Sequence, residues 1–420
     1  MELTYQIKDK PPIHITLLLA LQYLLACISA TITVPLVVGN GLTPAAALFG
    51  AGAGTLVYLA FTKMRSPMFL GSSFAFIGSM SAAFAGATTV ALGYLGLIIG
   101  AILAGSVYVV LAIIVKKCGT NWINKIMPPV IIGPVVAIIG LGLATSAISN
   151  FTSAGPYGVV VGIVTLFITA IVSVKGSPTA RMLPFIIGIG CGYLLSIVFS
   201  LAGTPIIDLS VFHSIELFSI PNFTFVQAFG GFKNFIPQYF ATIFLAFTPV
   251  AFSTFCEHLS DHLNLSNIIG TDLTKDPGLD KTLLGDGVGS VVGAFFGGAE
   301  NTSYGEAIAT TAFTKSASTY PILICAIMCI VTSFVGPIAT VLATIPGCVI
   351  GSVCVLLYGF IASSGLKIFK DIDFDNMRNI IIISTILVLG IGGFTLSFGS
   401  ITITSVACAL IFGIILNLIL

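Results

Sequence analysis

The sequence Gly297-Gly298-Ala299-Glu300-Asn301-Thr302-Ser303-Tyr304-Gly305-Glu306 interrupts a run of apolar residues and decides the fold class. Polar, turn-forming residues stand here where a continuous apolar helix would be expected. A second interruption, Met68-Phe69-Leu70-Gly71-Ser72-Ser73-Phe74-Ala75-Phe76, follows an apolar segment in the first half of the chain. Within a bilayer, broken backbone is tolerated only where it packs against protein or lines a cavity. Two interruptions at corresponding positions of two halves therefore predict a transporter's substrate site.

The composition is that of a protein that crosses a membrane many times. Of 420 residues, 57% are hydrophobic and only 7% are charged, whereas a soluble protein carries roughly 25% charged residues. The net charge of +1 offers no basic surface for nucleic acid. The nine cysteines lack the paired spacing of a metal or redox motif. We also find no Walker loop, dinucleotide fingerprint or nucleophile motif, so neither an enzyme nor a cofactor or metal site is expected.

Fourteen apolar segments of spanning or near-spanning length follow a polar tail of residues 1–12. A more polar stretch, residues 203–233, separates the first seven segments from the last seven. An odd number of segments in each half makes the halves antiparallel, as an inverted repeat requires. The segments are expected near residues 13–38, 44–62, 68–87, 90–115, 128–147, 157–174, 182–202, 234–259, 282–297, 300–316, 319–340, 346–364, 377–394 and 400–419.

Lysine and arginine gather in the connections on one face of the expected bundle. Lys63 and Arg65 follow the second segment, and Lys116 and Lys117 follow the fourth. The connections on the other face contain no lysine or arginine except Lys233. The positive-inside rule therefore predicts that both termini lie in the cytoplasm.

Five carboxylates lie within or at the edges of apolar segments and require an explanation. Holding a carboxylate at mid-membrane costs about 2.5–3.5 kcal/mol, so a functional role is the default interpretation. A carboxyl group held in such surroundings also takes up a proton readily, which favours proton coupling. The five are Glu257, Asp261, Asp286, Glu300 and Glu306.

Glu257 and Asp261 are four residues apart and share a helix face that would look into a polar cavity, with His258 and His262 on the neighbouring face. A hydrated helix end at the cytoplasmic side would explain Asp261 and His262 equally well. Two histidines four apart are weak evidence for a metal pair, and a structural or solvated role fits them better. Glu306 and Glu257 lack a neighbouring lysine or arginine, so a functional role is favoured for both.

The remaining two acids leave more than one interpretation open. A loop edge or helix packing would explain Asp286 as well as a role in ion coupling would. For Glu300, an exposed position on the outer face is the favoured interpretation.

The two interruptions also offer aromatic side chains and backbone donors. Phe74 and Tyr304 are explained equally by packing and by contact with a ligand. A short helix that starts after each break would present free backbone N–H groups and the positive end of its dipole. Carboxylates, amide donors and an aromatic wall together suit a small planar solute with N–H donors and C=O acceptors, such as a pyrimidinedione ring.

On these motifs the chain resembles the nucleobase/ascorbate transporter family, and it is most similar to the bacterial uracil permeases. The resemblance spans nearly all 420 residues. It implies an all-α membrane protein of fourteen segments in two inverted seven-segment repeats, with a short strand in segments three and ten. It also implies a core domain (residues 13–115 and 234–340) that moves against a gate domain (residues 128–202 and 346–420). The motifs that carry the resemblance are 70–76 (LGSSFAF), 256–259 (CEHL), 276–279 (DPGL), 301–306 (NTSYGE) and 356–359 (LLYG).

The resemblance also assigns roles to single residues. Glu257 and Glu306 fall on the acids that bind uracil, and the backbone contacts of the family fall on Phe74 and Gly305. Further positions near the base fall on Tyr304, Tyr358 and Ala30. The candidates for proton coupling are Glu257, Glu306, Asp261 and His258.

Four positions depart from the family pattern. Ala307 and Ala309 stand where the signature has Asn and Gly, although Thr314 and Lys315 close the motif normally. Asp261 and Tyr23 each stand where the family has a histidine. The histidine that Asp261 replaces is linked to proton coupling in the uracil permeases. The coupling ion, proton or sodium, therefore stays open.

The expected function is secondary active import of uracil across the cell membrane, coupled to protons and working by alternating access, because two acids lie beside two helix breaks. A xanthine or purine permease of the same family is the first alternative, but an acid at position 306, where purine carriers often have Gln, favours uracil. An anion transporter of the same fold is the second, and it predicts a cationic residue near the breaks. None occurs between Gly71 and Phe76 or between Glu300 and Glu306. The sequence leaves open whether the protein forms a homodimer.

Overall fold

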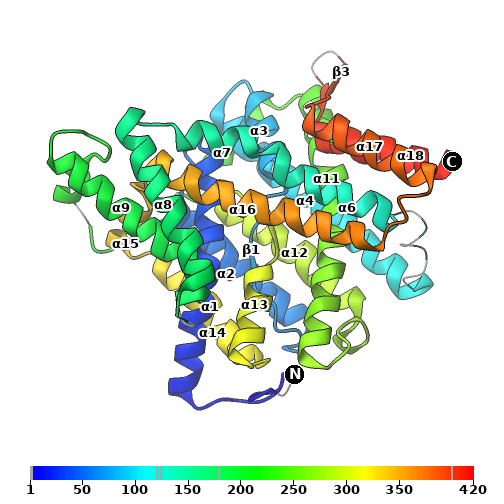
Figure 1. Cartoon of the computed structure of the whole chain (residues 1–420), viewed down its shortest axis with the longest axis horizontal. Coiled ribbons are helices and arrows are strands. Elements are labelled where there is room, and N and C mark those ends of the chain that lie inside the picture. The colour runs from blue at the N-terminus through cyan, green and yellow to red at the C-terminus, as the bar shows by residue number, and fades with distance from the viewer. Residues whose placement is uncertain are drawn as a thin grey trace.

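Glycine, proline and hydroxyl side chains set the ends of the helices in the computed structural model, which describes residues 3–119, 122, 125, 127–177, 180–214, 216–398 and 401–420 (Figure 1). α2 begins at Pro44, and the side chain of Thr43 accepts a hydrogen bond from the Ala46 N–H at 3.3 Å. α12 ends before Gly298, whose φ of 81° lies in the left-handed region that favours glycine. The apolar helix therefore stops just ahead of the interruption.

Helices make up most of the chain. In the first half they are α1 (Ile13–Val38), α2 (Pro44–Phe61), α3 (Ile77–Ala85), α4 (Val90–Cys118), α6 (Pro129–Gly142), α7 (Ala144–Phe151), α8 (Gly155–Lys175) and α9 (Pro184–Leu201). In the second half they are α10 (Thr224–Ala228), α11 (Pro237–Ile269), α12 (Leu279–Gly297), α13 (Gly305–Thr314), α14 (Thr319–Ser333), α15 (Gly336–Ala343), α16 (Gly347–Ile368), α17 (Met377–Ile391) and α18 (Ser405–Ile419).

Eight helices among the described residues are long and apolar enough to cross a membrane, and α14, α17 and α18 are shorter apolar helices. The chain is therefore a multi-pass membrane protein, as its composition predicts. The count of fourteen spans, their inverted repeat and the cytoplasmic position of the termini stay predictions.

The two interruptions meet as an antiparallel strand pair near the middle of the molecule. β1 (Leu70–Ser72) pairs with β2 (Asn301–Ser303), so that Leu70 lies opposite Ser303. The Ser73 N–H donates to the Glu300 carbonyl at 2.8 Å, and the Tyr304 N–H donates to the Phe69 carbonyl at 3.1 Å. The strands predicted in both interruptions are confirmed, and each leads into a short helix, α3 or α13.

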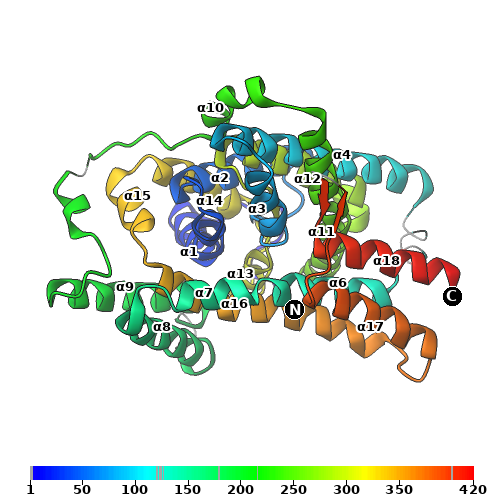
Figure 2. The ribbon, with the colours of Figure 1, turned by 90° about the horizontal axis from the view of Figure 1, so that it is seen from above.

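Close helix packing surrounds this strand pair. A Cβ atom added to Gly54 of α2 would lie 2.6 Å from the Gly289 carbonyl oxygen of α12, so the two helices approach to backbone contact there. The Asn301 side chain donates to the Gly50 carbonyl at 3.0 Å and joins β2 to α2. Figure 2 shows α7, α8, α9, α16 and α17 along one side of the molecule, with α1, α2, α4 and α14 on the other.

Several boundaries differ from those expected. α11 continues to Ile269 rather than residue 259, segment 128–147 divides into α6 and α7, and segment 319–340 divides into α14 and α15. The hairpin of β3 (Leu396–Phe398) and β4 (Ile401–Ile403) was not expected. Residue 400, the expected start of the last segment, lies outside the described residues.

The polar tail of residues 1–12 is not loose in its described part. Tyr5 forms a parallel bridge with Ser316, and the Ala317 N–H donates to the Tyr5 carbonyl at 2.9 Å. The Thr4 N–H donates to the Lys315 carbonyl at 2.8 Å. The tail therefore holds the turn that follows α13.

Candidate functional site

A cavity of about 810 Å³ lies against the strand pair. Its walls come from both interrupted segments and from α1, α6, α9, α11 and α16. Elements from the two sides of the molecule therefore enclose the same space. A volume of this size exceeds that of a single small planar ring and is typical of a ligand pocket.

Three carboxylates line this cavity. Glu257 and Asp261 reach it from α11, and Glu306 reaches it from the first turn of α13. The Ser303 hydroxyl donates to Asp261 Oδ2 at 2.9 Å. Asp261 and Glu257 do share a helix face toward this cavity, as their spacing predicts, although most of the cavity lining is apolar.

The alternative interpretation of Asp261 and His262 as residues of a hydrated helix end is wrong. α11 runs on to Ile269, so both residues lie inside the helix. His262 is fully buried, and its Nε2 lies 2.7 Å from the Tyr58 hydroxyl. It has no access to the hydrated end of the helix.

Backbone donors face the cavity where the short helices begin. α13 starts at Gly305, and the first N–H groups of a helix have no partner within it. A Cβ atom added at Gly305 would meet no other atom within 4 Å, so this backbone borders open space. Phe74 lines the same cavity just ahead of α3. The two predicted backbone positions are thus on one cavity wall.

Tyr304 braces the two interruptions against each other. Its hydroxyl donates to the Ser72 carbonyl at 2.9 Å, and the Thr31 hydroxyl donates to it at 3.3 Å. A Cβ atom at Gly71 would lie 2.3 Å from the Tyr304 ring, which explains glycine at that position. The aromatic side chain therefore packs against the strand pair, and Tyr304 is also one of the residues that line the cavity.

The remaining predicted residues take different positions. Ala30 of α1 lines the cavity, whereas Tyr358 and His258 are not among the residues that line it. Tyr358 lies behind Phe74, with their ring centroids 5.8 Å apart. Of the departures from the family pattern, Ala309 lines the cavity and Ala307 is fully buried.

Tyr23, the other position that departs from the family pattern, joins α1 to α13. Its hydroxyl lies 2.7 Å from the Thr311 hydroxyl, and the side chain is fully buried. Its role here is to pack the two helices together.

Glu300 does not lie on an exposed outer face, and that expectation is wrong. Its side chain is 0% exposed, and neither carboxyl oxygen has a hydrogen-bond partner among the described residues. The residue sits between the C-cap Gly298 and β2, where the chain turns back into the protein.

Asp286 is not at a loop edge. It lies within α12, is 1% exposed, and its Oδ2 is 2.5 Å from His258 Nδ1. Sequence reasoning missed this contact because the partners are 28 residues apart on different helices.

Arg181 is the one basic residue among the described residues that line the cavity. It is exposed, and its Nε donates to the Gly176 carbonyl at 2.7 Å. Among the described residues, the cavity lining therefore carries three acids and one cation, and that cation is exposed.

Comparisons with known proteins show the family of this chain. Residues 14–398 match a family model described as "Permease family". The uracil permease of Bacillus caldolyticus is 40% identical, over 99% of this chain and 94% of the relative. The uracil permease of Bacillus subtilis (strain 168) is 38% identical, again over 99% of this chain and 94% of the relative. The uracil permease of Escherichia coli (strain K12) is 34% identical over 98% of this chain and 93% of the relative.

Solved structures share the fold at low sequence identity. The transmembrane domain of a cyanobacterium bicarbonate transporter, BicA, gives a TM-score of 0.67 at 15% identity and covers 97% of this chain and 100% of that one. The murine Solute Carrier 26 family member A9 anion transporter in the inward-facing state gives a TM-score of 0.67 at 11% identity and covers 98% of this chain and 69% of that one. At these identities the likeness concerns the fold alone.

Proposed function

The chain belongs to the permease family whose model matches residues 14–398, and from this premise we propose that it imports uracil across the cell membrane as a secondary active transporter. One observation carries the proposal: Glu257 and Glu306 line one cavity with the first backbone N–H of α13. The relatives named uracil permease support the choice of substrate.

The cavity chemistry matches both kinds of polar group on the uracil ring. Glu257 and Glu306 accept hydrogen bonds from ring N–H groups, because ionised carboxylates are acceptors only. The backbone N–H groups at Gly305 and Phe74 donate to the ring carbonyls. Phe74 covers one ring face, and Tyr358 behind it holds the Phe74 ring in place.

Coupling to a proton is the second element of the proposal. Three acids share one cavity, and the described residues place no lysine or arginine within ion-pair distance of any of them. Repulsion between these carboxylates falls when one of them takes up a proton. Sodium in place of the proton remains the alternative.

Alternating access is the third element. The cavity lies between helices of the expected core domain, such as α11 and α13, and helices of the expected gate domain, such as α9 and α16. Movement of one group against the other opens the cavity to one side at a time. Arg181 and Ser364 line the cavity on the side of the basic connections, so this conformation faces the cytoplasm.

Two rival substrates follow from the family and the fold. A purine permease would use the same acids, and the large cavity leaves room for a second ring. An anion transporter is disfavoured because three acids line the cavity and its one described cation, Arg181, stands exposed at the mouth.

Uptake of labelled uracil by proteoliposomes tests the proposal. We expect uptake above that of protein-free liposomes, and greater uptake with an inward proton gradient. Competition with xanthine, hypoxanthine and thymine then ranks the substrates, and bicarbonate serves as the anion control. Absence of uracil uptake with and without the gradient would reject the proposed function.

A further inference from the structure

The cavity wall that belongs to the expected gate domain is mostly apolar. Ile132, Val136 and Ile139 follow one another at helical spacing along α6, so they present one apolar face to the cavity. Phe185 of α9 and Phe360 of α16 also line the cavity, and their ring centroids lie 6.1 Å apart in an edge-to-face arrangement. Phe360 is 53% exposed, so part of its ring is free for contact with a ligand. We call these five residues the gate wall.

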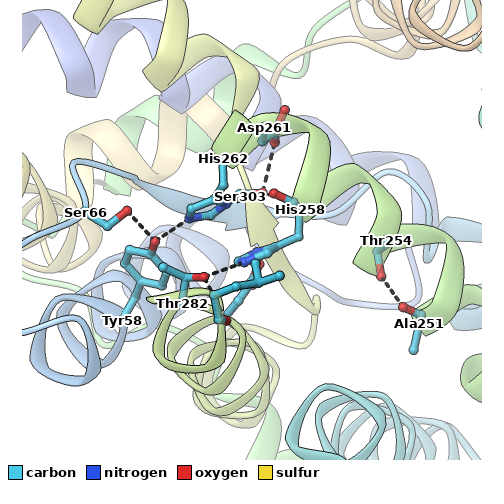
Figure 3. A network of polar contacts seen from close by, with 11 residues as sticks. Tyr58, Ser66, Ala251, Thr254, His258, Asp261, His262, Thr282 and Ser303 are labelled. Carbon is cyan, nitrogen blue, oxygen red and sulfur yellow. Dashed lines mark hydrogen bonds and ion pairs between the residues drawn. The ribbon is translucent and has the colours of Figure 1, made fainter. Parts of the chain in front are cut away.

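The carboxylates of the cavity lie on the other wall, which belongs to the expected core domain. Glu257 and Asp261 reach it from α11, and Glu306 reaches it from α13. Figure 3 shows Asp261 linked to Ser303, whose hydroxyl donates to Asp261 Oδ2 at 2.9 Å. The side chains of the gate wall contain neither a hydrogen-bond donor nor an oxygen acceptor. They therefore add nothing to the binding of ring N–H or C=O groups.

The cavity is larger than a single pyrimidinedione ring requires. Its volume of about 810 Å³ lies in the range of pockets that hold drug-sized ligands, roughly 300–1,000 Å³. Uracil carries its polar groups at N1, C2, N3 and C4, and in the proposed binding mode these groups contact the acids and backbone N–H groups of the core-domain wall. The remaining edge of the ring, C5 and C6, carries only hydrogen atoms. That edge therefore faces the gate wall.

We propose that the gate wall is a second subsite, which takes an aryl or alkyl group attached to the C5–C6 edge of a pyrimidinedione ring. Contact between such a group and the gate wall is favourable because it removes apolar surface of both from water. The pair of Phe185 and Phe360 adds edge-to-face contacts for an aromatic substituent. An uncharged substituent fits better than an anionic one, because three acids share the cavity.

A ligand that fills both subsites connects the two expected domains. Its ring is held by α11 and α13, and its substituent is held by α6, α9 and α16. Alternating access requires one group of helices to move against the other. Because the substituent gains its contacts only in the present conformation, the ligand shifts the equilibrium toward this conformation. Such a compound therefore binds and blocks the transporter without being carried across the membrane.

This inference rests on the proposed function, and 5-benzyluracil is the probe that separates the two. Isothermal titration of purified protein in detergent compares its Kd with that of uracil. We expect 5-benzyluracil to bind about tenfold more tightly, because its benzyl group buries about as much apolar surface as a phenylalanine side chain does, partly offset by the ordering of the ligand. In proteoliposomes, labelled 5-benzyluracil should not be taken up, and the unlabelled compound should inhibit uracil uptake.

Variants of the gate wall test where the benzyl group binds. Phe185→Ala and Phe360→Ala each remove one ring of the aromatic pair, and Val136→Phe fills part of the same space and serves if a truncated variant does not fold. We expect each to weaken 5-benzyluracil binding about tenfold, while the Kd of uracil stays within about threefold of wild type. Phe167→Ala is the matched control, because Phe167 of α8 is 60% exposed and does not line the cavity. It should leave the binding of both ligands unchanged.

The failure of the proposed function looks different from the failure of this inference. If the wild type neither binds nor takes up uracil, the proposed function fails. If the wild type takes up uracil but binds 5-benzyluracil no more tightly, or carries it across the membrane as it carries uracil, only the subsite is wrong. Wild-type binding of 5-benzyluracil by the folded gate-wall variants, or an equal loss of both ligands in them, would also overturn the inference.

Discussion

Glu257 and Glu306 reach the cavity from different helices, and each can accept a hydrogen bond that the other cannot replace. We predict that Glu257→Gln and Glu306→Gln each weaken uracil binding about tenfold to a hundredfold. The reason is that a hydrogen bond to a charged group contributes about 1.5–3 kcal/mol, and every 1.4 kcal/mol is about tenfold in Kd. Isothermal titration of purified protein in detergent measures the effect, and unchanged affinity in both variants would contradict the site assignment.

Gly71 offers a second test at the scale of a single residue. We predict that Gly71→Ala destabilises the protein by about 1–3 kcal/mol, because the added methyl group would press into the Tyr304 ring. Gly78→Ala in α3 is the control, since a Cβ atom there meets nothing within 4 Å. Thermal unfolding should show a lower midpoint for the first variant and an equal or higher one for the second.

Single ionisable residues were the part of the site that the sequence showed best. Glu257, Asp261 and Glu306 are conspicuous because carboxylates are rare in apolar segments. The pairing of His258 with Asp286 could not be predicted, because it depends on how α11 and α12 are placed against each other. Glu300 was misplaced for the same reason, since position along the chain does not reveal which side of a turn faces the interior.

At the scale of elements, the N-terminal tail has a measurable role. Backbone hydrogen bonds join Thr4 and Tyr5 to the turn of residues 315–317. We predict that removing residues 3–9 lowers the free energy of unfolding by about 1–3 kcal/mol, because each such bond contributes about 0.5–1.5 kcal/mol. Hydrogen exchange should rise first in α13, which this turn follows.

Tyr5→Ala is the matched control for the truncation, because it keeps the backbone pairing and removes only the half-buried ring. Its effect should be clearly smaller than that of the deletion. Equal exchange in α13 for wild type and truncated protein would show that the tail does not support this helix.

The two interrupted segments were predictable as elements because glycine and small polar residues break an apolar pattern at Gly71 and again at Gly305. The extension of α11 to Ile269 could not be predicted, because residues 260–267 are polar enough to suggest a loop. They form a helix because Leu265 and His262 are buried against neighbouring helices. The β3–β4 hairpin was missed because its strands are short and apolar, like the segments around them.

At the scale of the whole molecule, the open side of the cavity can be tested by chemical labelling. Ser364 is exposed on α16 and lines the cavity. In a background that lacks the accessible thiols of Cys118 and Cys191, we predict that Ser364→Cys reacts with an impermeant maleimide from the cytoplasmic side only. Uracil should slow the reaction, because the ligand occupies the same cavity.

Asn234→Cys is the control for sidedness, since Asn234 is exposed and lies in a connection that we expect on the opposite face of the membrane. It should react from the outside, with a rate that uracil leaves unchanged. Labelling of both positions from the same side would contradict the proposed orientation.

The pairing of β1 with β2 has a consequence for how the protein is made. During synthesis, residues 70–72 leave the ribosome long before residues 301–303 exist, so the first strand enters the membrane with its backbone groups unpaired. The nascent chain must keep this strand edge away from lipid until its second half has been synthesised. The strand pair beside the cavity therefore forms only after the second half of the chain has been made.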